Sequence, residues 1–200
     1  MAVPVSELQK INPSSVIELF TLTLDATLHG SSTVYRFHNG SSPNNNGEVI
    51  WAGNSYMRFP IQASGFEKGG KGKLPRPKFT VSNILGTLTA VMLDTNKVTP
   101  SIDLCGTKLT RIRTLARYLD AANWSTGTNP FGTPDPTSEL PREIFYFDRK
   151  SAETRDIVEW ECASAFDLSN GPKPPKRLIT RADFPGVGLC CQRKRKIFSL

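Results

Sequence analysis

Hydrophobic and polar residues follow a period of two near the start of the chain, in the segment Val16–Leu24. Phe20 and Leu22 would point to one face of a strand and the residues between them to the other, since successive strand side chains alternate. The segment Thr33–His38 repeats this pattern and is followed by Asn39-Gly40, a dipeptide typical of hairpin turns. Both segments are predicted to be strands.

Short apolar and aromatic runs follow, separated by glycine-containing turns. Their β-branched and aromatic residues suit a pleated, half-buried surface. Gly53-Asn54 and the cluster at Gly69–Gly72 supply the turn signals between the runs. We therefore expect a β-meander with strands at Ile50–Trp51, Tyr56–Phe59, Ile61–Phe66 and Phe79–Val81.

The period changes after Asn83, where apolar residues recur at helical spacing. Asn is a favoured N-cap because its side chain accepts a hydrogen bond from the first helical turn. One short helix is predicted from Asn83 to a point near residues 94–96, with its apolar stripe packed on the core. The stripe consists of Ile84, Leu85, Leu88, Val91 and Met92.

The segment Leu109–Asn123 fits two structures. As a strand it would place Arg111 and Arg113 on one face and Ile112 and Thr114 on the other. Leu109, Ile112, Ala116 and Leu119 would also form the stripe of a helix. The pattern alone does not choose between them, although the strands predicted around the segment favour a long strand.

The remaining pattern predicts one loop and two strands. Asn123–Pro141 contains four prolines and two glycines, which indicates a surface loop. Aromatic residues at strand spacing predict strands at Glu143–Asp148 and Ile157–Leu168. A turn signal at Ser169–Pro175 closes this region.

Length and composition indicate a globular protein. A chain of 200 residues with 38% hydrophobic content can bury one sizeable core, in one domain or at most two. No run approaches the roughly 18 consecutive apolar residues of a membrane span. The first ten residues lack the charged and apolar regions of a secretory signal peptide. We therefore expect the protein to stay in the cytoplasm where it is made until it assembles.

The net charge of +7 is concentrated at one end of the chain. Residues 1–172 hold 17 basic and 17 acidic side chains, whereas residues 173–200 hold eight basic side chains against Asp183 alone. We expect a β-rich domain over residues 1–172 and a basic C-terminal segment over residues 173–200. A nucleic-acid-binding domain would carry its basic residues on a folded face, so a solvated terminus is the simpler interpretation.

The polar residues contain no recognisable catalytic or metal-binding motif. His29 and His38 are the only histidines, which excludes most histidine-dependent sites, and no nucleotide-binding glycine motif is present. The cysteines lack the paired spacing of a zinc site, and free thiols are expected in a reducing compartment. They are Cys105, Cys162, Cys190 and Cys191.

Glu159 and Glu161 are the strongest candidates for a carboxylate pair. On one strand face they would lie about 7 Å apart, near the spacing of glycosidase carboxylates. They alternate with Val158 and Trp160, however, and such alternation is what a strand with one wet face shows. We therefore predict no catalytic, cofactor-binding or metal-binding residues and no enzymatic activity.

Two sets of basic side chains could bind a ligand or a protein partner. The segment Gly69–Pro77 could cradle a phosphate through its backbone N–H groups, although a solvated hinge between strands is simpler. If Leu109–Asn123 is a strand, its arginines form a basic ridge, for which acidic residues of a neighbouring subunit are the expected partners. The side chains are Lys71, Lys73 and Arg76 in the first group and Arg111, Arg113 and Arg117 in the second.

Several motifs occur in an order that is more specific than any one of them. W-x-G-x-x-Y-x-x-x-P-I-x-x-S-G-F-E spans Trp51–Glu67, G-K-G follows at Gly70–Gly72, and R-P-x-x-x-V-S-N spans Arg76–Asn83. This series resembles the opening domain of the phage minor tail protein L family. Ala116–Trp124 and Asp148–Arg177 are similar to later parts of the same family, so the resemblance covers about residues 15–180.

The resemblance implies a structural virion protein of a long-tailed phage. It implies a mainly β fold, a β-barrel-like tail hub domain with one short helix and long loops, and it favours the strand interpretation of Leu109–Asn123. The implied assembly is a homotrimeric ring at the tail tip, between the sixfold distal tail protein and the threefold central hub or receptor-binding protein. The tape measure protein is a further possible partner. The alternatives are a basic nucleic-acid-binding module and a small β-rich hydrolase.

The C-terminus departs from the family pattern. Family members similar to the lambdoid protein continue into a cysteine-rich region whose four thiolates hold an iron–sulfur cluster. After Pro175–Thr180 this chain has only Cys190 and Cys191. No cofactor is therefore expected.

Overall fold

The computed structural model describes residues 3–44, 46–67, 74–83, 86–165 and 167. The chain divides into two units, residues 1–165 and 166–200, and every element described below belongs to the first unit. The basic segment at 173–200, the turn expected at 169–175, Cys190 and Cys191 lie outside the described residues.

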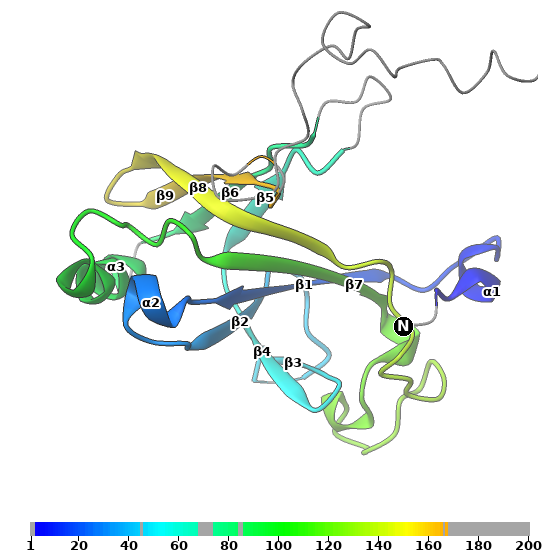
Figure 1. The fold of residues 1–200 in the computed structure, drawn as a ribbon. Coiled ribbons are helices and arrows are strands. Elements are labelled where there is room, and N and C mark those ends of the chain that lie inside the picture. The colour runs from blue at the N-terminus through cyan, green and yellow to red at the C-terminus, as the bar shows by residue number, and fades with distance from the viewer. Residues whose placement is uncertain (1–2, 45, 68–73, 84–85, 166, 168–200) are drawn as a thin grey trace, which may run out of the picture. The chain divides into compact units, whose positions relative to one another are not determined.

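Nine strands of the described residues form one sheet, which confirms a mainly β fold (Figure 1). The strand order is β3-β4-β2-β1-β7-β8-β9-β6-β5. Every pairing is antiparallel except that of β2 with β4. The strands are β1 (Val16–Thr23), β2 (Val34–His38), β3 (Val49–Trp51), β4 (Asn54–Arg58), β5 (Ile61–Ser64), β6 (Lys78–Ser82), β7 (Lys108–Leu115), β8 (Glu143–Glu153) and β9 (Ile157–Ala163).

The expected β-meander is wrong, although all four of its strands exist. β3 and β4 form a hairpin at one end of the sheet, whereas β5 and β6 form a hairpin at the other end. The break falls at Phe59-Pro60. Pro60 has no N–H to continue a ladder, and its carbonyl accepts a hydrogen bond from the Ser82 amide at 3.0 Å. The chain therefore leaves β2 after β4 and joins β6.

The sheet is strongly curled. β1 and β6 are separated by three strands, which in a flat sheet would put them roughly 19 Å apart. The rings of Phe20 on β1 and Phe79 on β6 nevertheless lie edge to face, with centroids 5.6 Å apart. Within the described residues no hydrogen-bonded ladder joins β5 to the other end, so the sheet is open and the expected barrel is not closed.

Two clusters of buried side chains cover the two faces of the central strands. The inner cluster fills the curl and includes Phe20, Phe147 and Trp160. The outer cluster includes Leu19 and Trp51. Leu19 and Phe20 are neighbours in β1 and both are fully buried, since each face of this strand is covered.

Three α-helices and two 3-10 helices accompany the sheet in the described residues, so the expectation of one helix is wrong. They are α1 (Val5–Leu8), α2 (Ala26–His29), α3 (Thr87–Val98), η1 (Ala116–Tyr118) and η2 (Ala121–Asn123). The predicted helix corresponds to α3, but it begins later than expected. Gly86, with a φ of 65°, occupies the N-cap position in place of Asn83. The Asn83 side chain still contacts the first turn as expected, since its Oδ1 accepts a hydrogen bond from the Thr89 amide at 3.4 Å. Gly86 begins the helix in the left-handed region. Glycine adopts this left-handed conformation at little cost.

β7, β8, β9 and the loop at residues 124–142 lie where the sequence pattern predicts them. The lengths of the strands differ from the predicted lengths. The strand interpretation of Leu109–Asn123 is confirmed as far as Leu115, after which the 3-10 helices follow. Residues 124–142 contain no helix or strand, as predicted. β8 extends beyond Asp148 through two irregularities in its register with β9, and β9 ends at Ala163, before the predicted Leu168.

Candidate functional site

The carboxylates of Glu159 and Glu161 are parts of ion pairs on the outside of the sheet. The Glu159 carboxylate lies 3.0 Å from Lys78 Nζ. Glu161 accepts a hydrogen bond from Arg149 Nε at 2.8 Å and lies 3.4 Å from Arg76 Nη1. The bond from Arg149 lowers the pKa of Glu161, whereas a general acid at neutral pH needs a raised pKa. The geometry supports the structural interpretation of these residues.

The arginines of β7 are neutralised by acids of the same chain, not by acids of a neighbouring subunit as expected. The Arg111 guanidinium contacts Glu18 and lies 2.9 Å from a Glu143 oxygen. Arg113 bonds the second Glu143 oxygen at 3.0 Å. These side chains are mostly buried beside their acids, so they are not a free basic ridge. Arg117, in η1, lies 3.5 Å from the buried carboxylate of Glu7.

The remaining candidate residues, which are the basic residues of Gly69–Pro77 and the cysteines, give no further evidence of a binding or catalytic site. Lys71 and Lys73 lie outside the described residues, and Arg76 pairs with Asp148 at 3.3 Å as well as with Glu161. Cys105 and Cys162 are free thiols, as predicted. No group of three potential metal ligands occurs in the part of the chain that the structure describes. Among the same residues, no helix has the length and apolar character needed to cross a bilayer.

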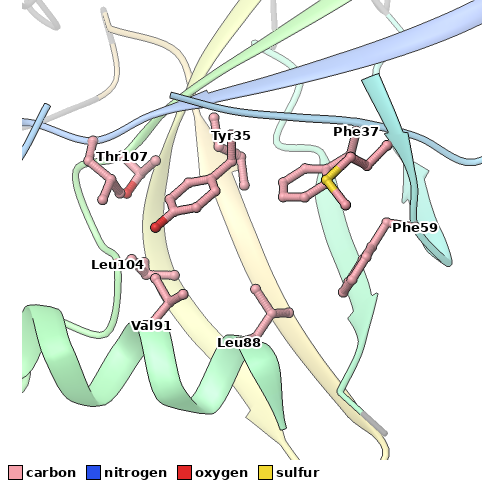
Figure 2. Close-up of a pocket in the computed structure, with 10 residues that line it drawn as sticks. Tyr35, Phe37, Phe59, Leu88, Val91, Leu104 and Thr107 are labelled. Atoms are coloured by element: carbon pink, nitrogen blue, oxygen red, sulfur yellow. The ribbon is translucent and has the colours of Figure 1, made fainter. Parts of the chain in front are cut away.

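The most distinctive concave feature is an apolar pocket, here called the β2–α3 pocket (Figure 2). Its volume is about 230 Å³. Figure 2 shows the rings of Tyr35, Phe37 and Phe59 on one side and α3 with Leu88 and Val91 on the other. The lining residues are Leu22, Leu24, Tyr35, Phe37, Met57, Phe59, Leu88, Val91, Leu104 and Thr107.

The β2–α3 pocket adjoins an incompletely paired strand. β4 pairs with β2 only at Phe37 and His38, so residues 34–36 have no ladder partner on that side among the described residues. Met57 lines the pocket and is 60% exposed, which leaves an apolar surface beside the unpaired backbone. Arg36 and Arg58 alternate with pocket residues along β2 and β4, and neither forms an ion pair with a described residue. Unpaired backbone beside exposed apolar side chains is a surface suited to a protein partner.

The loop 124–142 presents a second exposed apolar group. Phe131 is 58% exposed and packs edge to face on Trp124, with ring centroids 6.2 Å apart. Asn129 fixes the loop, because its Nδ2 donates to the carbonyls of Arg117 and Leu119 at 2.9 and 3.0 Å. The loop therefore holds an aromatic side chain in a defined place on the surface.

Comparison with known proteins identifies the family. The sequence profile of phage minor tail protein L matches residues 27–186, which is most of the chain. The chain belongs to the phage minor tail protein L family. This membership confirms the resemblance found in the motifs. It makes the chain a structural protein of a phage tail, and therefore a component of the virion, in a family that is not one of enzymes.

Tail tip protein L of Escherichia phage lambda is a relative of this minor tail protein. The two are 41% identical over 93 residues, which are 46% of this chain and 37% of the lambda protein. The match thus spans little more than a third of the lambda protein's length.

Sequence reasoning missed the two apolar surface features of this minor tail protein. The β2–α3 pocket draws its lining from β1, β2, β4, α3 and the segment before β7, and no short motif contains these residues. The only local signal was the same-face pair Tyr35 and Phe37, whose rings are stacked with centroids 6.2 Å apart. Phe131 had a clearer signal, since an aromatic residue between Pro130 and Gly132 in a predicted surface loop has little chance of burial.

Proposed function

We propose that this minor tail protein is a ring-forming adaptor at the tail tip. It forms a homotrimer between the sixfold distal tail protein and the threefold central hub or receptor-binding protein. Its localisation is the tail tip of the virion, after synthesis in the host cytoplasm. The single observation that carries the proposal is the open curled sheet, which exposes strand edges and an apolar pocket in the first unit.

Strand edges support a role in assembly. β3 and β5 end the sheet, and each has a ladder partner on one side only within the described residues. Unpaired edges template the addition of strands from other chains, so proteins that remain monomeric usually protect them. A ring subunit has neighbours that can cover such edges, and closed rings arise when contacts between unlike surfaces repeat around an axis.

Charge supports protein partners over nucleic acid for the first unit. The arginines of β7 and Arg76 already bind carboxylates of the same chain. A nucleic-acid site would need several free cations aligned on one face. In the proposed assembly the basic segment 173–200 contacts an acidic surface of the central hub or of the tape measure protein.

Cryo-electron microscopy of purified tails tests the adaptor role. We expect three copies in one ring at the tip, located between the distal tail ring and the hub. Mass spectrometry of the same particles should give three copies per tail when it is calibrated on the tail tube subunit. Six copies, or no copy at the tip, would contradict the proposal. A steep salt dependence of DNA binding by the full-length chain would favour the nucleic-acid alternative.

A further inference from the structure

We propose that Phe131 of one copy inserts into the β2–α3 pocket of the next copy in the ring. This inference rests on the proposed ring and specifies the contact that links its subunits. The proposed contact joins two surface features of the same chain. One is an exposed aromatic side chain on a fixed loop, and the other is an apolar pocket that lies beside an incompletely paired strand.

The two features lie at opposite ends of β7 (Figure 1). Pocket residues Leu104 and Thr107 come just before β7. The loop 124–142 is tied to the other end, where the Leu140 amide donates to the Arg113 carbonyl at 2.8 Å. Eight residues of strand span about 25 Å, so Phe131 cannot reach the pocket of its own chain. Unlike surfaces at opposite ends of a subunit produce head-to-tail contacts, which close into a ring when the rotation permits.

The loop is preorganised for insertion. The Phe131 amide donates to Asn129 Oδ1 at 2.9 Å, and the Asn129 side chain is itself bonded to the backbone near η1. Gly132 lies against Arg117, where an added Cβ would approach Nε to 2.7 Å, so the loop packs closely on its support. A loop that is already ordered loses little conformational entropy when it binds. The fixed position of Phe131 is what a protruding anchor requires.

The pocket matches a phenyl ring in chemistry and size. Aromatic rings and aliphatic side chains form its wall, and its volume is about 230 Å³. An apolar cavity of about 150 Å³ suffices to bind benzene. Figure 2 shows the rings of Tyr35, Phe37 and Phe59 around the space, so an entering ring would meet aromatic edges and faces. Aromatic anchors in apolar pockets typically carry most of the binding energy of an interface.

Photo-crosslinking in assembled tails tests the contact. Benzoylphenylalanine is placed at position 131 of the full-length chain, and crosslinked peptides are identified by mass spectrometry. We expect a crosslink between two copies of this chain, with the second peptide containing residues 35–37, 57–59 or 88–91 of the pocket. The matched control carries the same group at Leu93 of α3, which is 61% exposed and does not line the pocket. A crosslink from position 131 only to another tail protein, or to no protein, would overturn the inference.

Substitutions on both sides give an independent readout. Phe131→Ser and Met57→Asp change exposed side chains, so the fold should be retained, which circular dichroism and the melting temperature verify. Each variant should lower the amount of this protein in tails at least tenfold, whereas the control Leu93→Ser should leave it unchanged. Normal incorporation of either variant would contradict the proposed contact. A ring of three copies whose position 131 crosslinks elsewhere would reject this contact alone, whereas absence of the ring would reject the proposed function.

Discussion

At the scale of the residue, burial determines the chemistry of Cys162. This thiol is fully buried on β9, and its burial raises the pKa to about 12. The negative charges of Glu161 and Asp148 contribute in the same direction. Only the thiolate is a nucleophile or metal ligand, so the side chain acts as a small apolar group at neutral pH.

The raised pKa predicts that Cys162 resists alkylation. A pKa of about 12 against an ordinary value of 9.0 lowers the thiolate fraction on the order of a thousandfold. Native protein treated with iodoacetamide at pH 8 should therefore carry no label on the Cys162 peptide, while the half-buried Cys105 reacts slowly. The same treatment in denaturant should label both. Equal labelling of Cys162 in native and denatured protein would show that the strand is not buried.

At the scale of the element, α3 shows how one helix serves both the core and the proposed interface. Leu88 and Met92 belong to the inner core, Val91 packs against that core and lines the pocket, and Leu93 is exposed. One face of the helix therefore covers the interior of the curled sheet. The neighbouring positions Met92 and Leu93 differ in burial although they are similar in size and polarity.

This difference predicts unequal effects of alanine on stability. Met92 is 3% exposed, so Met92→Ala should lower the free energy of unfolding by about 2 to 5 kcal/mol through lost packing and a residual cavity. Leu93 is 61% exposed, and Leu93→Ala should change it by less than about 0.5 kcal/mol. Urea unfolding of both variants measures the two values. Similar losses would show that α3 does not pack as described.

At the scale of the whole molecule, the net charge is concentrated in one part of the sequence. The first unit contains both buried clusters, whereas the entire net charge of +7 arises in residues 173–200. Eight cations in one short segment repel one another unless an opposite charge is near. This distribution supports the proposed contact of residues 173–200 with an acidic partner.

Deletion of residues 185–200 tests whether this segment supports the fold or binds a partner. The melting temperature of the isolated protein should stay within a few degrees of the full chain, because a change at a chain terminus is expected to cost about 1 kcal/mol or less. Incorporation into tails should fall, since the segment loses four of its eight basic side chains. A large loss of thermal stability in the isolated deletion protein would show that the segment supports the fold, and partner binding would then be the wrong explanation.

The sequence by itself determined where strands form and to which family the chain belongs. Alternation located β1 and β2, turn signals bounded β3 and β4, and the prolines of residues 124–142 predicted the loop. These are local properties, since a period or a turn depends on residues close together in the chain. The motif series from Trp51 to Asn83 indicated the family, because an ordered set of matches is a property of sequence alone.

Only the tertiary structure decided which strands pair, which charged side chains meet and where a pocket forms. The hairpins on either side of Pro60 lie at opposite ends of the sheet, and Arg111 meets Glu18 and Glu143, because such contacts join residues far apart in the chain. The alternation of hydrophobic and polar residues along a strand does not specify which distant strand pairs with it. The β2–α3 pocket depends on the same curl, since its walls come from segments that meet only when the sheet bends around α3.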